Sequence, residues 1–261
     1  MDESTQEITT ATRRDFIEKL GSTVFAGLVL GGVKLAAKGT EAASSGAVPM
    51  PASPFKIADH ADQDVLIRMQ AELERAMKKA PKERRWGMVI DTRKCVGCMD
   101  CVVACQTENN VPVGYARDWI TTEVRGEFPN LTMEIRSERC NHCDNPPCVQ
   151  CCPTGASHVE DFGKVVLVTP NMCIGCKACV SSCPYDARYV HPQGYVDKCT
   201  FCYHRTKDGK DPACVSVCPT RCMYFGDLDD PASTVSKLLR TRQHHSLLPE
   251  AGTKPRIFYM T

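Results

Sequence analysis

The 261-residue chain contains 18 cysteines, and sixteen of them fall into four regularly spaced groups. Numbered in chain order, the groups are Cys95, Cys98, Cys101 and Cys105 (group one); Cys140, Cys143, Cys148 and Cys152 (group two); Cys173, Cys176, Cys179 and Cys183 (group three); and Cys199, Cys202, Cys214 and Cys218 (group four). Four thiolates hold one [4Fe-4S] cluster. The sequence therefore predicts four [4Fe-4S] clusters with these sixteen cysteines as ligands, and no catalytic residue.

The gaps within each group have a physical reason. Cysteines separated by two residues wrap a tight loop, whose backbone amides point inward and donate to cluster sulfides. Group three has the complete bacterial ferredoxin spacing with its terminal proline, and in such runs the fourth cysteine reaches the other cluster of a pair. We expect this fourth cysteine to start a helix and the following proline to occupy its first turn.

Two other uses of the cysteines stay open at this point. Structural zinc takes four tetrahedral ligands from paired two-residue spacings, whereas three cysteines at two-residue intervals followed by a fourth supply a geometry that zinc does not require. Disulfides are compatible with an exported protein, but cysteines so close in every group would form crowded rings. The spacing favours iron–sulfur clusters over both.

Several residues near the groups are predicted to have no ligand role. Cys151 and Cys222 fall outside the repeating spacing, so we expect them to be small buried thiols. The nearby histidines, His142, His158 and His204, are expected to pack around the ligand loops or to lie at the surface. The basic residues Lys177, Lys198 and Arg188 could place positive charge near the anionic clusters and raise their potentials, but we expect their side chains to be solvated.

Short elements must position these loops. The hydrophobic pattern predicts a helix over residues 62–79, a strand over 85–91, a hairpin from 119–125 and 131–137, and a second hairpin around 159 and 165–168. Asp230 and Pro231 are expected to cap and open a helix that runs through Leu239. No stretch offers a large apolar core, so we expect inorganic groups to contribute much of the stability.

The amino-terminal region and the composition restrict the class of protein. The net charge of +1 argues against nucleic-acid binding as the main function. The longest apolar run, residues 20–33, is too short for a transmembrane helix. Because Arg13 and Arg14 precede Phe16 and this run, the region resembles a twin-arginine export signal, and we expect a periplasmic protein at the outer face of the cytoplasmic membrane.

The order of the groups, the four-residue gap before Cys148, the segment Lys198–Cys202 and the run Phe225–Leu228 resemble the four-cluster subunits of the complex iron–sulfur molybdoenzymes. Members include the iron–sulfur subunits of polysulfide, tetrathionate and dimethyl sulfoxide reductases and the NrfC-like proteins. The likeness covers residues 86–239.

The resemblance implies an α+β fold of two pseudo-symmetric ferredoxin-like domains with two [4Fe-4S] clusters each, plus added hairpins and terminal helices. The expected parts are a signal region (1–40), a linker and amphipathic helix (41–84), one domain (85–138 with 196–245), a second domain (139–195) and a tail (246–261). Group one pairs with group four and group two with group three. The crossed ligand sets are then Cys95, Cys98, Cys101 with Cys218; Cys199, Cys202, Cys214 with Cys105; Cys140, Cys143, Cys148 with Cys183; and Cys173, Cys176, Cys179 with Cys152.

The implied function is electron transfer between two partners of an exported, quinone-linked respiratory complex. The partners are a molybdopterin or tungstopterin catalytic subunit and an NrfD-type or cytochrome membrane subunit, the chain having no transmembrane helix of its own. Two alternatives are a subunit of a membrane redox complex without molybdenum, as in DsrO-like proteins, and a free-standing periplasmic polyferredoxin.

Overall fold

The computed structural model describes residues 64–261, which belong to one compact unit. The expected signal region, the linker and the apolar run at 20–33 lie outside the described residues. Within the described part, no helix is long and apolar enough to cross a membrane.

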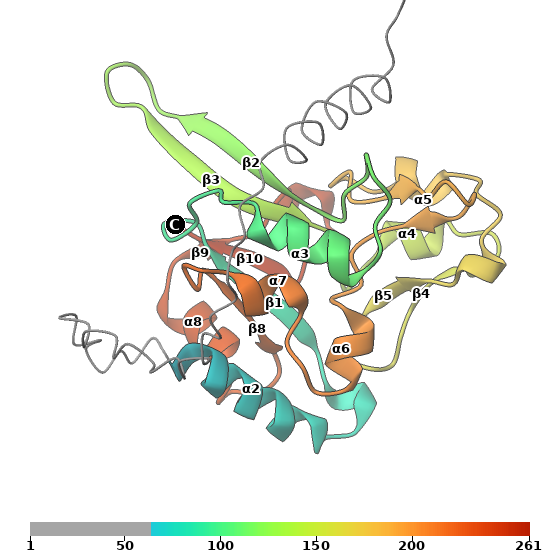
Figure 1. The fold of residues 1–261 in the computed structure, drawn as a ribbon, viewed down its shortest axis with the longest axis horizontal. Coiled ribbons are helices and arrows are strands. Elements are labelled where there is room, and N and C mark those ends of the chain that lie inside the picture. The colour runs from blue at the N-terminus through green and yellow to red at the C-terminus, as the bar shows by residue number, and fades with distance from the viewer. Residues whose placement is uncertain (1–63) are drawn as a thin grey trace, which may run out of the picture. The chain divides into compact units, whose positions relative to one another are not determined.

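A four-stranded sheet forms the centre of the unit (Figure 1). Its strand order is β8 (Met223–Asp227), β1 (Trp86–Asp91), β10 (Ile257–Met260) and β9 (His244–His245). β1 pairs antiparallel with β8 and parallel with β10. The strand expected at 85–91 is thus confirmed.

Helices α2 (Asp64–Met77) and α8 (Thr234–Thr241) pack on this sheet against β8. The apolar stripe predicted for the first helix is buried at Val65, Met69 and Leu73. The expected start of α8 is wrong by three residues: Ser233 is the N-cap, and its side chain accepts from the backbone N–H of Ser236.

Contrary to the sequence-based expectation, the unit has a substantial apolar core. It joins α2 and α8 to the sheet, and its largest members have no exposed surface, among them Trp86, Phe225, Met69 and Tyr259. The expectation failed because each contributing segment is short, and the core forms only where segments far apart in the chain meet.

The segment 246–261, expected to be a tail, also belongs to this core. It contains the short helix η3 (Pro249–Ala251) and strand β10, whose Ile257 and Tyr259 are fully buried beside β1. A parallel pairing between residues as far apart in the chain as Met88 and Ile257 leaves no local pattern in the sequence.

Both predicted hairpins are confirmed. Strands β2 (Asp118–Arg125) and β3 (Thr132–Arg139) form a long ribbon that projects from the body (Figure 1). Strands β4 (Ser157–Val159) and β5 (Val166–Val168) form a short one. A third pair joins β6 (Tyr189–Val190) to β7 (Val196–Asp197).

One short helix accompanies each cysteine group: α3 (Asp100–Glu108), α4 (Pro147–Gln150), α5 (Ala178–Ser181) and α7 (Ala213–Val217). Helix α3 packs against α7, and α4 packs against α5, so groups one and four are neighbours, as are groups two and three. The remaining described elements are α6 (Tyr203–Lys207), η1 (Pro81–Glu83) and η2 (Pro170–Met172).

The expected helix starts are wrong. Each helix begins just before the third cysteine of its group, and in groups two, three and four the fourth cysteine lies just beyond the last helical residue. The prolines Pro153, Pro184 and Pro219 therefore follow the helix end, where a residue that cannot continue the helix is favoured.

Candidate iron–sulfur sites

The sixteen spaced cysteines line four separate cavities. We name each cavity after the group that contributes three cysteines. The sets are Cys95, Cys98, Cys101 and Cys218 in the group-one cavity; Cys140, Cys143, Cys148 and Cys183 in the group-two cavity; Cys173, Cys176, Cys179 and Cys152 in the group-three cavity; and Cys199, Cys202, Cys214 and Cys105 in the group-four cavity. These are the same crossed sets that the sequence analysis expects.

The loops that present the cysteines share one backbone feature. The residue before the second cysteine has a left-handed conformation in all four groups: Gly97 (φ 68°), His142 (φ 45°), Gly175 (φ 67°) and Phe201 (φ 52°). This conformation turns the chain so that the first two thiols point to the same side. At Gly175 a side chain would also collide with the carbonyl oxygen of Gly194, at 2.4 Å from an added Cβ.

Backbone amides donate to several of the cavity sulfurs. The N–H groups of Ser157, Val196 and Phe201 lie 3.3 to 3.4 Å from the sulfurs of Cys152, Cys173 and Cys199 respectively. Such hydrogen bonds stabilise a thiolate, which is the form that ligates iron.

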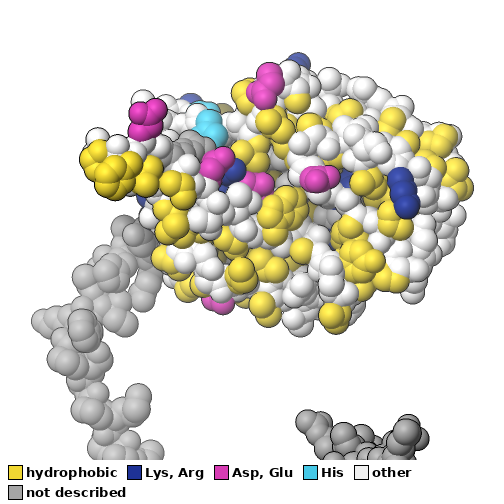
Figure 2. Space-filling view, turned by 90° about the horizontal axis from the view of Figure 1, so that it is seen from above, with side chains coloured by type: hydrophobic (Ala, Val, Ile, Leu, Met, Phe, Trp, Pro, Cys, Tyr) yellow, Lys and Arg dark blue, Asp and Glu magenta, His cyan; other side chains and the backbone are white. Residues whose placement is uncertain are grey.

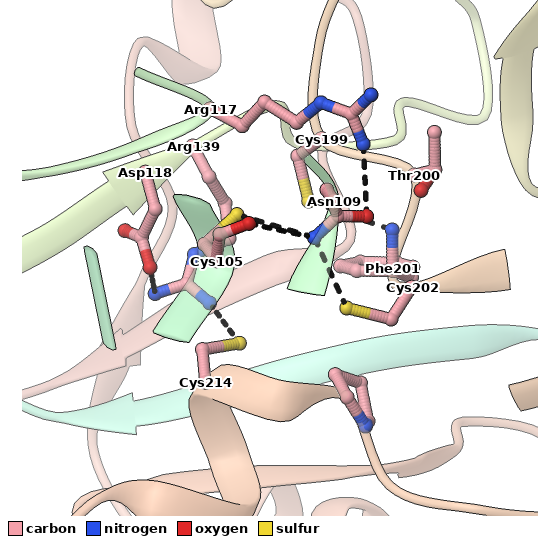
Figure 3. A pocket seen from close by; sticks show the side chains of 11 residues that line it. Cys105, Asn109, Arg117, Asp118, Arg139, Cys199, Thr200, Phe201, Cys202 and Cys214 are labelled. Atoms are coloured by element: carbon pink, nitrogen blue, oxygen red, sulfur yellow. Dashed lines mark hydrogen bonds and ion pairs between the residues drawn. The ribbon is translucent and has the colours of Figure 1, made fainter. Parts of the chain in front are cut away.

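Two buried arginines also face the cavities. In the group-four cavity, Arg139 donates from Nη1 to the sulfur of Cys214 at 2.9 Å, while Asn109 approaches Cys105 and Cys202 (Figure 3). In the group-two cavity, Arg188 donates to the sulfur of Cys148 at 2.8 Å. A buried guanidinium beside a sulfur favours the thiolate form, which is the form that ligates iron.

Both arginines retain unused donors. Nε of Arg139 and both Nε and Nη1 of Arg188 are buried without an acceptor among the described residues, although both side chains line cavities. Buried donors normally have acceptors. A cluster fits the sites because its sulfides would accept these hydrogen bonds.

Some of the buried ligand thiols resist ionisation without a metal. Burial raises the pKa of Cys101 and of Cys199 to about 12. At neutral pH these side chains are therefore protonated until iron displaces the proton.

The alternatives to clusters do not match this geometry. All 18 cysteines are free thiols, so the chain contains no disulfide framework. A zinc site needs sulfurs about 2.3 Å from one ion, whereas no three potential ligands in residues 64–261 converge closely enough to hold a single ion. The sulfurs surround a larger space instead.

The two remaining cysteines differ from each other. Cys222 is buried, as expected, but it lines the group-one cavity, and its sulfur lies 3.4 Å from that of Cys218. Cys151 is exposed, contrary to expectation, with its sulfur 3.2 Å from the hydroxyl of Ser182. It follows the last residue of α4, on the side that faces solvent.

The expectation of solvated basic residues is wrong for two of the three. Lys177 is exposed, but Arg188 and Lys198 are buried. The Lys198 ammonium donates to the carbonyl oxygens of Val166 and Cys199. Charged residues are normally predicted to be exposed. For Arg188 and Lys198, the only indication of burial in the sequence is their position beside the ligand cysteines.

The histidines pack around the ligand loops or lie near solvent, as expected. His142 is fully buried and stacks on Phe201 with ring centroids 3.8 Å apart, which joins the loops of groups two and four. Burial lowers the pKa of His142 well below its usual value. His204 is exposed and pairs with Glu108, and His158 is half-buried.

Comparison with known proteins gives a consistent result. Two family models, both described as 4Fe-4S dicluster domains, match residues 94–156 and 131–228. The chain is 44% identical to NrfC of Escherichia coli (67% of this chain, 79% of the relative) and 40% identical to an NrfC homolog of Haemophilus influenzae (70% and 82%). It is also 38% identical to ArrB, the iron–sulfur subunit of the arsenate respiratory reductase of a Shewanella species (67% and 96%).

Proposed function

Since the chain belongs to the NrfC-like family of iron–sulfur electron-transfer subunits and carries four [4Fe-4S] clusters, we propose that it connects a catalytic subunit to a quinone-linked membrane subunit. The catalytic partner would hold molybdopterin or tungstopterin, and the membrane partner would be NrfD-type or a cytochrome. We assign the four crossed cysteine sets as the ligands, in two pseudo-symmetric ferredoxin-like lobes.

Bound clusters supply one-electron transfer, and the protein supplies their positions and surroundings. The cysteine loops hold the four groups apart, and the amides and arginines compensate negative charge on the sulfurs. No acid, base or nucleophile role is needed for this function. The chain is accordingly a non-catalytic subunit.

The observation that carries the proposal is the unequal exposure of the four loops. In groups one and three, Cys98 and Cys176 are exposed, and the residues beside them, Val96 and Ile174, are 62% and 67% exposed. The loops of groups two and four are mostly buried. Exposed apolar residues beside a redox site are suited to docking a partner protein.

The surface around the group-one loop extends this apolar area. Met99 and Val103 on α3 are exposed, as are Phe128 and Met133 on the hairpin β2–β3. Viewed from above, hydrophobic side chains gather on the projecting ribbon and the neighbouring surface, and charged ones are sparse (Figure 2). We propose that this face binds the catalytic subunit and that the group-three end faces the membrane subunit.

Co-purification tests the partners. The tagged full chain, isolated from its native cells in mild detergent, is expected to bring a subunit containing molybdenum or tungsten and a membrane subunit, identified by metal analysis, haem analysis and mass spectrometry. Isolation with a membrane partner but without either metal would favour the DsrO-like alternative. A monomer without partners would favour a free-standing polyferredoxin and contradict the proposal.

We propose export by the twin-arginine route to the outer face of the cytoplasmic membrane, supported by Arg13 and Arg14 before an apolar run. Changing both to lysine is expected to retain the cluster-loaded chain in the cytoplasm, as measured by fractionation and immunoblotting. Normal export of the double variant would refute this assignment.

A further inference from the structure

Arg188 lines the group-two cavity and reaches a residue that lines the group-three cavity. It is only 5% exposed. Its Nη2 group lies 2.8 Å from the sulfur of Cys148 in the group-two cavity and 2.9 Å from the hydroxyl of Ser157. Its side chain also interacts electrostatically with Cys179, and Ser157 and Cys179 both line the group-three cavity.

Arg139 occupies the corresponding place between the other two cavities. It donates to the sulfur of Cys214 in the group-four cavity and to the hydroxyl of Ser137. Ser137 lies 3.7 Å from the sulfur of Cys101 in the group-one cavity. Each arginine thus donates to the third cysteine of one group and to a serine beside the cavity of the paired group.

The two arginines differ in their counter-charge. Nη2 of Arg139 lies 3.1 Å from the carboxylate of Asp118, which also accepts a hydrogen bond from Ser137. For Arg188, no carboxylate of the described residues lies at ion-pair distance.

A second unpaired cation strengthens this contrast. Lys198 is 1% exposed and bonds only to backbone carbonyl oxygens, and it interacts electrostatically with both Cys140 and Cys148. A buried charge without an opposite charge costs several kcal/mol. The negative charge that balances Arg188 and Lys198 must therefore come from the ligand thiolates and what they bind.

Building on the proposed ligand sets, we propose that Arg188 is the shared counter-ion of the clusters in the group-two and group-three cavities and raises the reduction potential of both. Reduction adds negative charge to a cluster, so a cation in contact with its ligands stabilises the reduced form more than the oxidised form. Arg139 has a smaller net effect on its two cavities because Asp118 offsets its charge.

The test is a redox titration of the full chain with its clusters, followed by electron paramagnetic resonance. In Arg188→Gln, two of the four midpoint potentials are expected to shift downward together, and Arg188→Lys should restore most of the shift in at least one. The matched control is Arg136→Gln, because Arg136 is similarly buried but faces Glu123 and Glu138 on the hairpin. It should shift none.

Four unchanged potentials in Arg188→Gln, or a shift of one alone, would overturn the inference. If the glutamine variant does not hold its clusters, iron content decides between charge and packing. Arg188→Lys should then load fully and Arg188→Met should not, whereas equal loading or equal failure of the two would overturn the counter-ion role. Fewer than four clusters in the unmodified chain would instead contradict the proposed ligand sets.

Discussion

The inner ligand loops, of groups two and four, differ from the outer loops, of groups one and three, at the same two positions. After the first cysteine, the outer loops carry the exposed residues Val96 and Ile174, whereas the group-two loop carries the buried Asn141. Before the second cysteine, the outer loops have glycine and the inner loops have the stacked rings of His142 and Phe201.

The difference shows that the same left-handed turn before the second cysteine can form both in exposed loops and in buried loops. A left-handed conformation costs glycine little but costs other residues roughly 1 to 2 kcal/mol. The outer loops avoid this cost before the second cysteine, although Met99 and Lys177 bear it one residue after that cysteine, and they leave Cys98 and Cys176 exposed. In the inner loops, His142 and Phe201 both carry this cost. Their buried rings stack on each other and hold the two inner loops together.

Loss of a ligand should have the largest effect and should differ between the two kinds of loop. Cys98→Ala, at an exposed outer position, is expected to remove one cluster, about four iron per chain, and to leave the fold intact. Cys140→Ala, in the main core, is expected to abolish soluble, cluster-loaded protein. Iron analysis and circular dichroism measure both, and equal behaviour of the two would contradict the comparison.

Iron removal should follow the same order. A chelator under oxidising conditions is expected to strip the outer clusters first, because Cys98 and Cys176 are exposed. Visible absorbance should fall in two phases, with loss of helical circular dichroism only in the second. A single phase, in which iron and secondary structure are lost together, would show that exposure does not control cluster loss.

Removing one ring of the inner stack should destabilise the protein more than straining an outer glycine. Phe201→Ala is expected to cost about 3 to 5 kcal/mol, because Phe201 packs on both His142 and Phe225. Gly97→Ala should cost about 1 to 2 kcal/mol, because its positive φ disfavours a side chain. The midpoint of denaturant-induced loss of cluster absorbance compares the two, and a larger effect at Gly97 would reverse the argument.

Charges placed on the outer loops should weaken docking without affecting the clusters. Val96→Glu and Ile174→Glu are each expected to reduce binding of a different partner about tenfold, roughly 1.4 kcal/mol. Pull-down of the separate subunits measures this. If both variants lose the same partner, the two outer loops do not serve opposite ends of the chain.

The smallest effects are expected at the two cysteines outside the groups. Cys151→Ala should leave iron content unchanged and stability within about 0.5 kcal/mol, because the thiol is exposed. Cys222→Ala should also keep all its iron, but the buried sulfur beside Cys218 makes a modest loss of stability expected. Loss of a cluster in either variant would mean that its cysteine is a ligand.

The local features of this molecule could be predicted from its sequence. Cysteine spacing predicts the loops because the gap length itself determines the turn, and alternating residues predict the strands of the ribbon 118–139 to within two residues at each end. The crossed sets of cysteines around the cavities agree with the resemblance to a family, which supplies long-range pairing that spacing alone does not contain.

The features that could not be predicted depend on partners distant in sequence. The burial of Arg188 and Lys198 could not be predicted, because the negative charge that is expected to balance them belongs to inorganic clusters. No residue pattern encodes that charge. The exposure of Cys151 depends on which side of a single helical turn faces solvent. Trp86 packs in the core against Phe162 and Phe225, which are distant from it in the sequence.

The pairing of β1 with β10 also has a consequence for the order of events during synthesis. While residues 257–260 are still within the ribosome, β1 has a neighbour only on the β8 side, and Ile257 and Tyr259 are absent from the core. The sheet beneath the cysteine loops therefore closes only after translation has passed residue 260. Stable insertion of the inner clusters is consequently expected only after residues 257–260 have left the ribosome, even though all sixteen spaced cysteines emerge earlier.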